Sequence, residues 1–118
     1  MLTKIKNEWG TITIDQEVIA RIAGLTAPEC YGIVGMAAKS MKDGLVHLLK
    51  KESLTKGVRI EMDDEYLTIN LYIIVEYGTN INAIAETLKD NVKYRVEEQT
   101  GLPVGLVNVF VEGVRIEQ

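Results

Sequence analysis

Hydrophobic and polar residues alternate most regularly in YLTINLYIIVE, at Tyr66–Glu76. Successive side chains of a strand point to opposite faces, so every second residue of this stretch shares one face. One set of alternate positions is wholly aliphatic and predicts the buried face of a long strand: Leu67, Ile69, Leu71, Ile73 and Val75.

Shorter patterns of the same period predict four further strands, at Trp9–Ile14, Tyr31–Met36, Val58–Met62 and Leu106–Val114. In the last of these we expect the core face to carry Val107, Val109 and Val111.

Apolar residues at three- and four-residue spacing predict three helices. The first follows Asp15, whose carboxylate can cap a helix, and Pro28 stops it. Its apolar face would hold Val18, Ile19, Ile22, Ala23 and Thr26. The second helix is short and spans Lys39–Lys51.

The third helix begins at a cap formed by Thr79 or Asn80 and ends at Gly101, a residue suited to the left-handed conformation after a last turn. Its inward stripe would hold Ile81, Ile84, Ala85, Leu88, Val92 and Val96. The predicted order is therefore β-α-β-α-β-β-α-β, an α+β fold of two layers with a mixed sheet. We expect a single domain over residues 1–118, with residues 1–8 as a flexible N-terminus.

Composition and charge indicate the cellular compartment and disfavour some classes of protein. One cysteine in 118 residues forms no internal disulfide, which favours the reducing cytoplasm. The N-terminal stretch lacks the apolar run of a signal peptide, and no stretch predicts direct insertion into a membrane. The net charge is −4, which disfavours nucleic-acid binding. The lysines near Lys39–Lys56 are interpreted as a solvated helix face, or else as a patch for an acidic partner or anionic lipid headgroups.

The stretch ECYGIVGM raises the question of catalysis, because it holds the single cysteine, Cys30. A catalytic thiolate needs a base or a positive field, but its neighbour is Glu29 and the one histidine, His47, lies on another predicted helix. We therefore interpret Cys30 as a small buried hydrophobe, and Gly32 and Gly35 as sites of close backbone approach.

Other candidate sites are weak. His47 has no second ligand at helical spacing, and Asp63–Asp64–Glu65 lacks the spacing of a calcium loop. In YGTNI, Tyr77–Ile81, a single glycine before a helix fits a cap better than a phosphate site. The sequence predicts no catalytic, cofactor-binding or metal-binding residues.

The face of the long strand opposite the core carries Tyr66, Thr68, Asn70, Tyr72, Ile74 and Glu76. The same face of the last strand carries Leu106, Asn108, Phe110, Glu112 and Val114. This face is too apolar for a fully solvated sheet and too polar for a second core. Either it is exposed and binds protein, with Tyr72, Ile74 and Phe110 as contact residues, or one of the two earlier helices covers it.

These stretches together resemble the alkaline shock protein family of Gram-positive bacteria. The resemblance rests on GTITIDQEVIARIAG, ECYGIVGM, KDGLVHLLK, KGVRIE, INLYIIVEYGTNI, VKYRVEEQTGL and VNVFVEGVRI, in the order and spacing of the family. It is strongest to the short members without extended tails.

The resemblance implies a non-enzymatic protein of envelope stress response and homeostasis. Such a protein is a homo-oligomer and binds a membrane-anchored or metabolic partner, in the cytoplasm or at the inner face of the membrane through that partner. The alternative is a small-molecule-binding regulator or enzyme with a pocket near Cys30 and His47.

Overall fold

The computed structural model describes residues 2–7, 10–37, 55–62 and 66–116. Along the chain the elements are β1 (Leu2–Asn7), β2 (Gly10–Asp15), α1 (Gln16–Thr26), the 3-10 turn η1 (Ala27–Glu29), β3 (Ile33–Met36), β4 (Val58–Met62), β5 (Leu67–Glu76), α2 (Ile81–Thr100) and β6 (Val104–Arg115). The expected helix Lys39–Lys51, His47 and the acidic turn Asp63–Glu65 lie outside the described residues.

Strand β5 is the centre of the main sheet. Strand β6 pairs with it in parallel along one side. On the other side β4 pairs antiparallel with the first half of β5, and β3 pairs antiparallel with its second half. Because parallel strands need a crossover connection, α2 carries the chain from the end of β5 back to the start of β6. The predicted mixed sheet and α+β class are confirmed.

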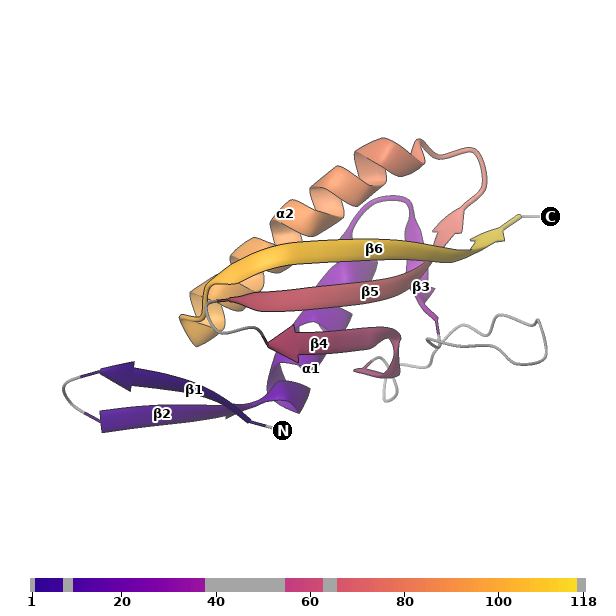
Figure 1. Ribbon diagram of the computed structural model, residues 1–118. Helices are drawn as coiled ribbons and strands as arrows, with labels where there is room; N and C mark the ends of the chain where they lie inside the picture. The colour runs from indigo at the N-terminus through magenta and orange to yellow at the C-terminus, as the bar shows by residue number, and fades with distance from the viewer. Residues whose placement is uncertain (1, 8–9, 38–54, 63–65, 117–118) are drawn as a thin grey trace.

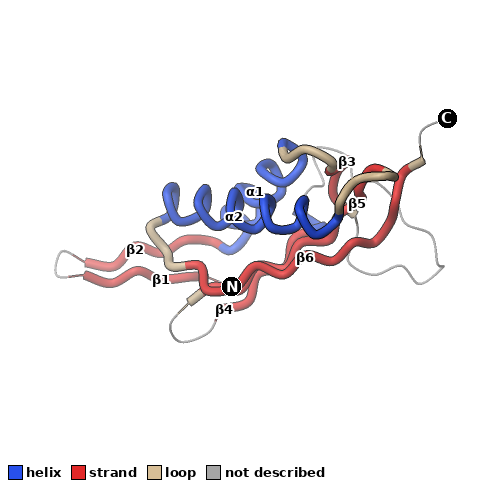
Figure 2. The backbone as a smooth tube through the Cα atoms, turned by 90° about the horizontal axis from the view of Figure 1, so that it is seen from above, coloured by secondary structure: helices blue, strands red, loops and turns tan. Residues whose placement is uncertain are grey.

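Both described helices lie on the same side of this sheet, as Figures 1 and 2 show from two directions. The core lies between the layers. All five aliphatic residues predicted for the core face of β5 are at most 1% exposed. They pack in one cluster with buried residues of both helices, including Ile19, Ala23, Leu88, Val92 and Val96.

Helix α2 begins and ends as its sequence predicts. The Asn80 side chain accepts a hydrogen bond from the Ala83 N–H at 3.2 Å, and Gly101 takes the left-handed conformation with φ of 75°. The prediction that Ile81 belongs to the buried stripe is wrong, because its side chain is 44% exposed. Side chains of a helix tilt toward its N-terminus. The side chain of Ile81, the first residue of α2, therefore extends beyond the core side chains that bury Ile84.

Helix α1 is capped by Asp15, which accepts a hydrogen bond from the Glu17 N–H at 2.9 Å, and it ends before Pro28 as predicted. The expectation for Val18 is wrong, since half of its side chain is exposed. The buried residues of α1 are mostly small, among them Ala20, Ala23 and Gly24. Burial of this small-residue stripe leaves Val18 and Leu25 on the solvent side.

The N-terminal segment differs from the expected flexible N-terminus. Leu2–Asn7 is strand β1, which pairs antiparallel with β2 from Leu2 opposite Asp15 to Asn7 opposite Gly10. In Figure 1 this hairpin extends away from the main sheet. Its pairing partner is the strand predicted at Trp9–Ile14, observed at Gly10–Asp15.

Strand β6 contains two irregularities in its pairing with β5. Leu67 and Thr68 pair with Val104 and Leu106, so Gly105 is an extra residue. Farther along, Ile73 and Ile74 pair with Val111 and Gly113, so Glu112 is a second extra residue. The second bulge shifts the alternation by one, and Val114 therefore pairs with Val75, a residue of the core face. The expected place of Val114 on the opposite face is wrong.

Of the three valines predicted for the core face of β6, Val107 is buried, Val109 is half-buried and Val111 is exposed. Val111 pairs with Ile73 and so lies on the predicted core face, but it is 36% exposed there. Burial falls from Val107 to Val111 along β6, which has β5 as its one strand neighbour among the described residues.

Candidate interaction surface and the surroundings of Cys30

The face of the sheet opposite the helices, here called the outer face, is the side of β5 and β6 turned away from the core. No helix lies over it in the described part of the chain (Figures 1 and 2). Of the two earlier helices expected as a possible cover, α1 packs on the core side, and Lys39–Lys51 is not among the described residues.

Two aromatic rings stack on the outer face. Tyr72 of β5 and Phe110 of β6 are register partners, and their ring centroids lie 4.8 Å apart with an angle of 12° between the planes. Phe110 is 43% exposed, and Tyr72 is half-buried. The third expected contact residue, Ile74, is only 8% exposed and offers little surface.

A side-chain hydrogen bond lies beside this stack. The Asn108 Nδ2 donates to Asn70 Oδ1 at 2.9 Å, joining the same two strands one pair of residues earlier. Asn70 is buried, and a buried amide needs a partner because water no longer satisfies it. The pair therefore favours the observed register of β5 with β6.

Near the start of β6 the ring of Tyr66 lies directly over Gly105. A Cβ built on that glycine would come within 2.1 Å of Tyr66 Cδ2, so the ring occupies the space that a side chain would need. Leu106 follows on the same face and is 51% exposed. Tyr66, Tyr72, Leu106 and Phe110 together form what we call the outer-face patch.

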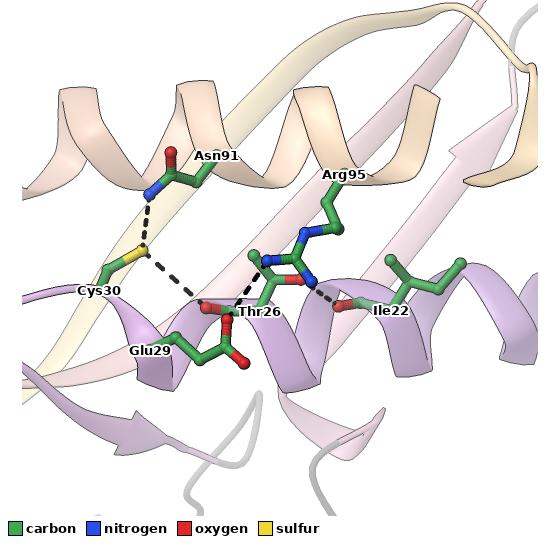
Figure 3. A network of polar contacts seen from close by, with 6 residues as sticks. All are labelled: Ile22, Thr26, Glu29, Cys30, Asn91 and Arg95. Atoms are coloured by element: carbon green, nitrogen blue, oxygen red, sulfur yellow. Dashed lines mark hydrogen bonds and ion pairs between the residues drawn. The ribbon is translucent and has the colours of Figure 1, made fainter. Parts of the chain in front are cut away.

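Cys30 lies between the end of α1 and the middle of α2, with 7% of its surface exposed. Figure 3 shows its two polar neighbours. The Asn91 Nδ2 donates to the sulfur at 3.3 Å, and the thiol lies 3.9 Å from the Thr26 backbone oxygen. A helix turn and an amide thus enclose the thiol, as expected for a packed residue.

Gly32, two residues after Cys30, confirms the interpretation that the backbone packs closely in this stretch. Gly32 has φ of +85°, and an added Cβ would come within 2.3 Å of Ile84 Cδ1 on α2. The left-handed conformation therefore favours glycine at this position, which lies against the Ile84 side chain of α2.

A small pocket of about 360 Å³ adjoins the thiol, lined by Thr26, Glu29, Cys30, Asn91, Tyr94 and Arg95. Arg95 forms an exposed ion pair with Glu29 at 3.5 Å. The sequence pattern does not reveal Asn91 and Arg95 as neighbours of Cys30, since they come from α2 and only the packing of α1 on α2 brings them to the thiol. His47, the other residue of the expected pocket, is not among the described residues.

A larger groove of about 900 Å³ runs between α1 and the C-terminal part of α2. Aliphatic residues of α1, including Val18, Ile22 and Leu25, form its apolar side, and Arg21, Glu29 and Arg95 line its charged side. Over the described ranges no three His, Cys, Asp or Glu side chains converge in a way that could hold a metal ion.

The chain is thus an α+β domain in which two described helices cover one face of a mixed sheet and an aromatic pair lies on the other. Comparison with models of protein families then shows to which family the chain belongs. The model of the alkaline shock protein 23 family, described by a cell envelope-related function, matches residues 4–116, and the chain belongs to this family.

Relatives agree with this assignment. The uncharacterized protein YloU of Bacillus subtilis (strain 168) is 45% identical over 117 residues, with 98% of each chain covered. The uncharacterized protein Spy1614 of Streptococcus pyogenes serotype M6 is 36% identical over 98% of this chain and 97% of its own length. A stress response regulator gls24 homolog of Streptococcus pyogenes serotype M3 is 30% identical over 92% of this chain, which spans 61% of that relative.

No solved structure matches the chain. None of the described helices combines the length and the apolar character that crossing a membrane requires.

Proposed function

We propose that this protein contributes to cell-envelope homeostasis without catalysis, by self-association and by binding a membrane-anchored or metabolic partner protein in the cytoplasm or at the inner face of the membrane. The family supplies the link to the envelope. The observation that carries the binding role is the stacked Tyr72–Phe110 pair on the outer face, with Phe110 43% exposed.

Aromatic residues surrounded by polar ones are typical of the centres of protein interfaces. The outer-face patch has this composition, since Thr68, Asn70 and Asn108 lie among its aromatic and aliphatic members. A stacked pair also loses little conformational freedom on binding, because each ring already restrains the other.

The surroundings of Cys30 support the absence of catalysis. A nucleophilic cysteine needs an accessible thiolate and a positive field or a base. Here the thiol is buried, its partners are an amide and a backbone carbonyl, and Arg95, which lines the adjoining pocket, is paired with Glu29.

Self-association is tested first by light scattering on the purified chain over a wide range of concentration. The proposal expects a mass that rises above that of the 13.2 kDa monomer. A mass that stays monomeric at every concentration would remove self-association from the proposal.

Partner binding is tested with the tagged chain and membranes from a bacterium that holds this protein, followed by identification of the retained proteins. Phe110→Ser should lose a specific partner that the unaltered chain retains. Tyr94→Ser, which removes an aromatic ring 65% exposed on α2, is the matched control and should retain it. Equal recovery by both variants would contradict binding through the outer-face patch.

The pocket beside Cys30 favours a second candidate, a small-molecule-binding regulator. Its volume of about 360 Å³ is at the lower end for a small ligand. Thermal shift with a library of small metabolites tests it, and stabilisation that disappears in Asn91→Ala would support this candidate.

A further inference from the structure

Strand β6 is an edge strand of unusual length. It runs for 12 residues and, in the described ranges, has β5 as its single strand neighbour. Alternate residues of an edge strand turn their N–H and C=O groups away from the sheet, and those groups offer hydrogen bonds to another strand. The edge of β6 therefore has the chemistry to bind a strand.

Proteins protect such edges from pairing with charged side chains, especially lysine, and with proline. Between Val104 and Arg115 there is neither lysine nor proline, and the first charged residue is Glu112. The opposite side of the sheet differs, because β4 has five residues and carries Arg59 and Glu61. The β6 edge is thus the less protected of the two.

The two bulges delimit the part of β6 that can pair regularly. Gly105 and Glu112 are the extra residues, so the regular run between them is Leu106–Val111. A Glu97 side-chain oxygen accepts a hydrogen bond from the Val104 N–H at 2.9 Å, which occupies the start of the strand. Any added strand must therefore pair with this run.

The run complements itself when two copies are placed antiparallel about a two-fold axis at Asn108. Leu106 then lies opposite Phe110 of a second copy on the outer face, and Val107 lies opposite Val109 on the core side. Both of these pairs match apolar with apolar, Asn108 meets its own copy, and Val111 lies opposite Gly105 at the first bulge. An axis at Val109 would instead place Asn108 opposite Phe110 and Leu106 opposite Glu112.

We propose that two copies of this chain associate through their β6 edges, antiparallel and with the two-fold axis at Asn108, to form one continuous sheet. The inference rests on the self-association proposed above and names its surface. Isologous contacts of this kind close into a dimer, because the same segment is used on both copies.

In this dimer, the Asn70–Asn108 hydrogen bond and the outer-face patch of one copy would each continue into the second copy. The Asn70–Asn108 hydrogen bond would continue into the Asn108 and Asn70 side chains of the second copy, as a row of amides across the sheet. The two outer-face patches would meet, with Leu106 of each copy against Phe110 of the other. The dimer thereby offers a partner one larger aromatic surface.

Disulfide trapping tests this register. Directly opposed residues in antiparallel strands have Cα atoms about 4.5–5.5 Å apart, within the range that a disulfide spans. Under mild oxidation, Asn108→Cys should convert most of the chain to a covalent dimer. Thr68→Cys, on the same face of β5, should not, because the two β5 strands would be separated by three strand spacings, about 14 Å. The unaltered chain controls for Cys30.

Charge at the axis provides a test that needs no disulfide. Asn108→Lys and Asn108→Asp each place like charges opposite each other and should raise the dimer dissociation constant by about tenfold or more. An equimolar mixture of the two variants should recover a dimer. Thr13→Lys, at an exposed position of β2 in the hairpin that extends away from the main sheet, should leave the dissociation constant unchanged.

The outcomes separate the two proposals. If the unaltered chain associates but Asn108→Cys forms no more covalent dimer than Thr68→Cys, the β6 edge is not the contact and this inference is wrong, while self-association stands. If the unaltered chain is monomeric at all concentrations, self-association itself fails and the inference fails with it.

Discussion

The Asn91 side-chain amide donates a hydrogen bond to the Cys30 sulfur across 3.3 Å, and so joins the middle of α2 to the residue that follows η1. The amide of Asn91 points at the thiol from the side of α2, opposite the Thr26 backbone oxygen of α1 (Figure 3). This hydrogen bond helps to explain why Cys30, in the stretch with Tyr31, Gly32 and Gly35, is a packing residue in this fold.

Cys30 should therefore react slowly with a thiol reagent in the native protein and fully after denaturation, because it is 7% exposed. Asn91→Ala removes the covering amide and should speed the native reaction. Asn82→Ala, an exposed asparagine of the same helix, is the control and should not. The measurement is the labelled fraction against time by mass spectrometry. Rapid labelling of the unaltered chain would contradict the packed thiol.

The contribution of α2 to stability should follow burial rather than hydrophobic pattern. Leu88 is fully buried, so Leu88→Ala should lower the free energy of unfolding by about 2–5 kcal/mol. Ile81 belongs to the same apolar pattern but is 44% exposed, and Ile81→Ala should cost less than about 1 kcal/mol. Urea unfolding of both variants checks this difference, and equal losses would contradict the structure at Ile81.

Gly105→Ala should destabilise the fold by about 1–3 kcal/mol, because the new methyl group would collide with the Tyr66 ring. The cost should shrink when Tyr66→Ala removes the ring beforehand. Denaturant unfolding of the four chains in this double-mutant cycle gives the coupling between the two positions. An equal cost of Gly105→Ala with and without the ring would show that the contact is not its cause.

Tyr94 provides a prediction about pH. A hydrogen bond from its hydroxyl to the Glu98 carboxylate, and then the negative charge of that group, raise the pKa of Tyr94 above its ordinary value of 10.0. The folded protein thus holds this proton at a pH where the unfolded chain releases it. The contribution to stability is complete below the unfolded pKa and is lost as the pH rises through the folded pKa.

Glu98→Gln removes the charge and should move the titration of Tyr94 to lower pH. The difference in phenolate absorbance between this variant and the unaltered chain measures the shift, and Tyr94→Phe identifies the signal. Titration curves that coincide would contradict the pairing of Tyr94 with Glu98.

The sequence was sufficient for the parts of the fold that depend on local pattern. The core face of β5, the caps at Asp15 and Asn80, and the stop at Gly101 all follow from periodicity or from the chemistry of one residue. Val18 and Ile81 were misplaced because a periodic face shows which residues are apolar but not which of them meet the facing layer. Strand β1 was missed because its pairing with β2 gives Leu2–Asn7 an order that its own pattern does not predict.

For the candidate surface, too, the local pattern predicts only part of the arrangement, and the rest depends on strand pairing. Alternation placed Tyr72 and Phe110 on one face, but their stacking depends on the register of β5 with β6. The bulges at Gly105 and Glu112 exist only relative to a partner strand, so no single-strand pattern reveals them or the shift that they impose on Val114.

The position of β5 between β6 on one side and β3 and β4 on the other has a consequence for how the chain folds. Pairs of β4 with β5 are 5 to 13 residues apart in sequence, from Met62–Leu67 to Val58–Leu71, whereas pairs of β5 with β6 and of β3 with β5 are 37 to 42 residues apart. Short loops close at lower entropic cost, which favours the β4–β5 hairpin as the first part of the sheet to form. We expect its amides to gain protection from hydrogen exchange first during refolding, and those of β3 and β6 to follow.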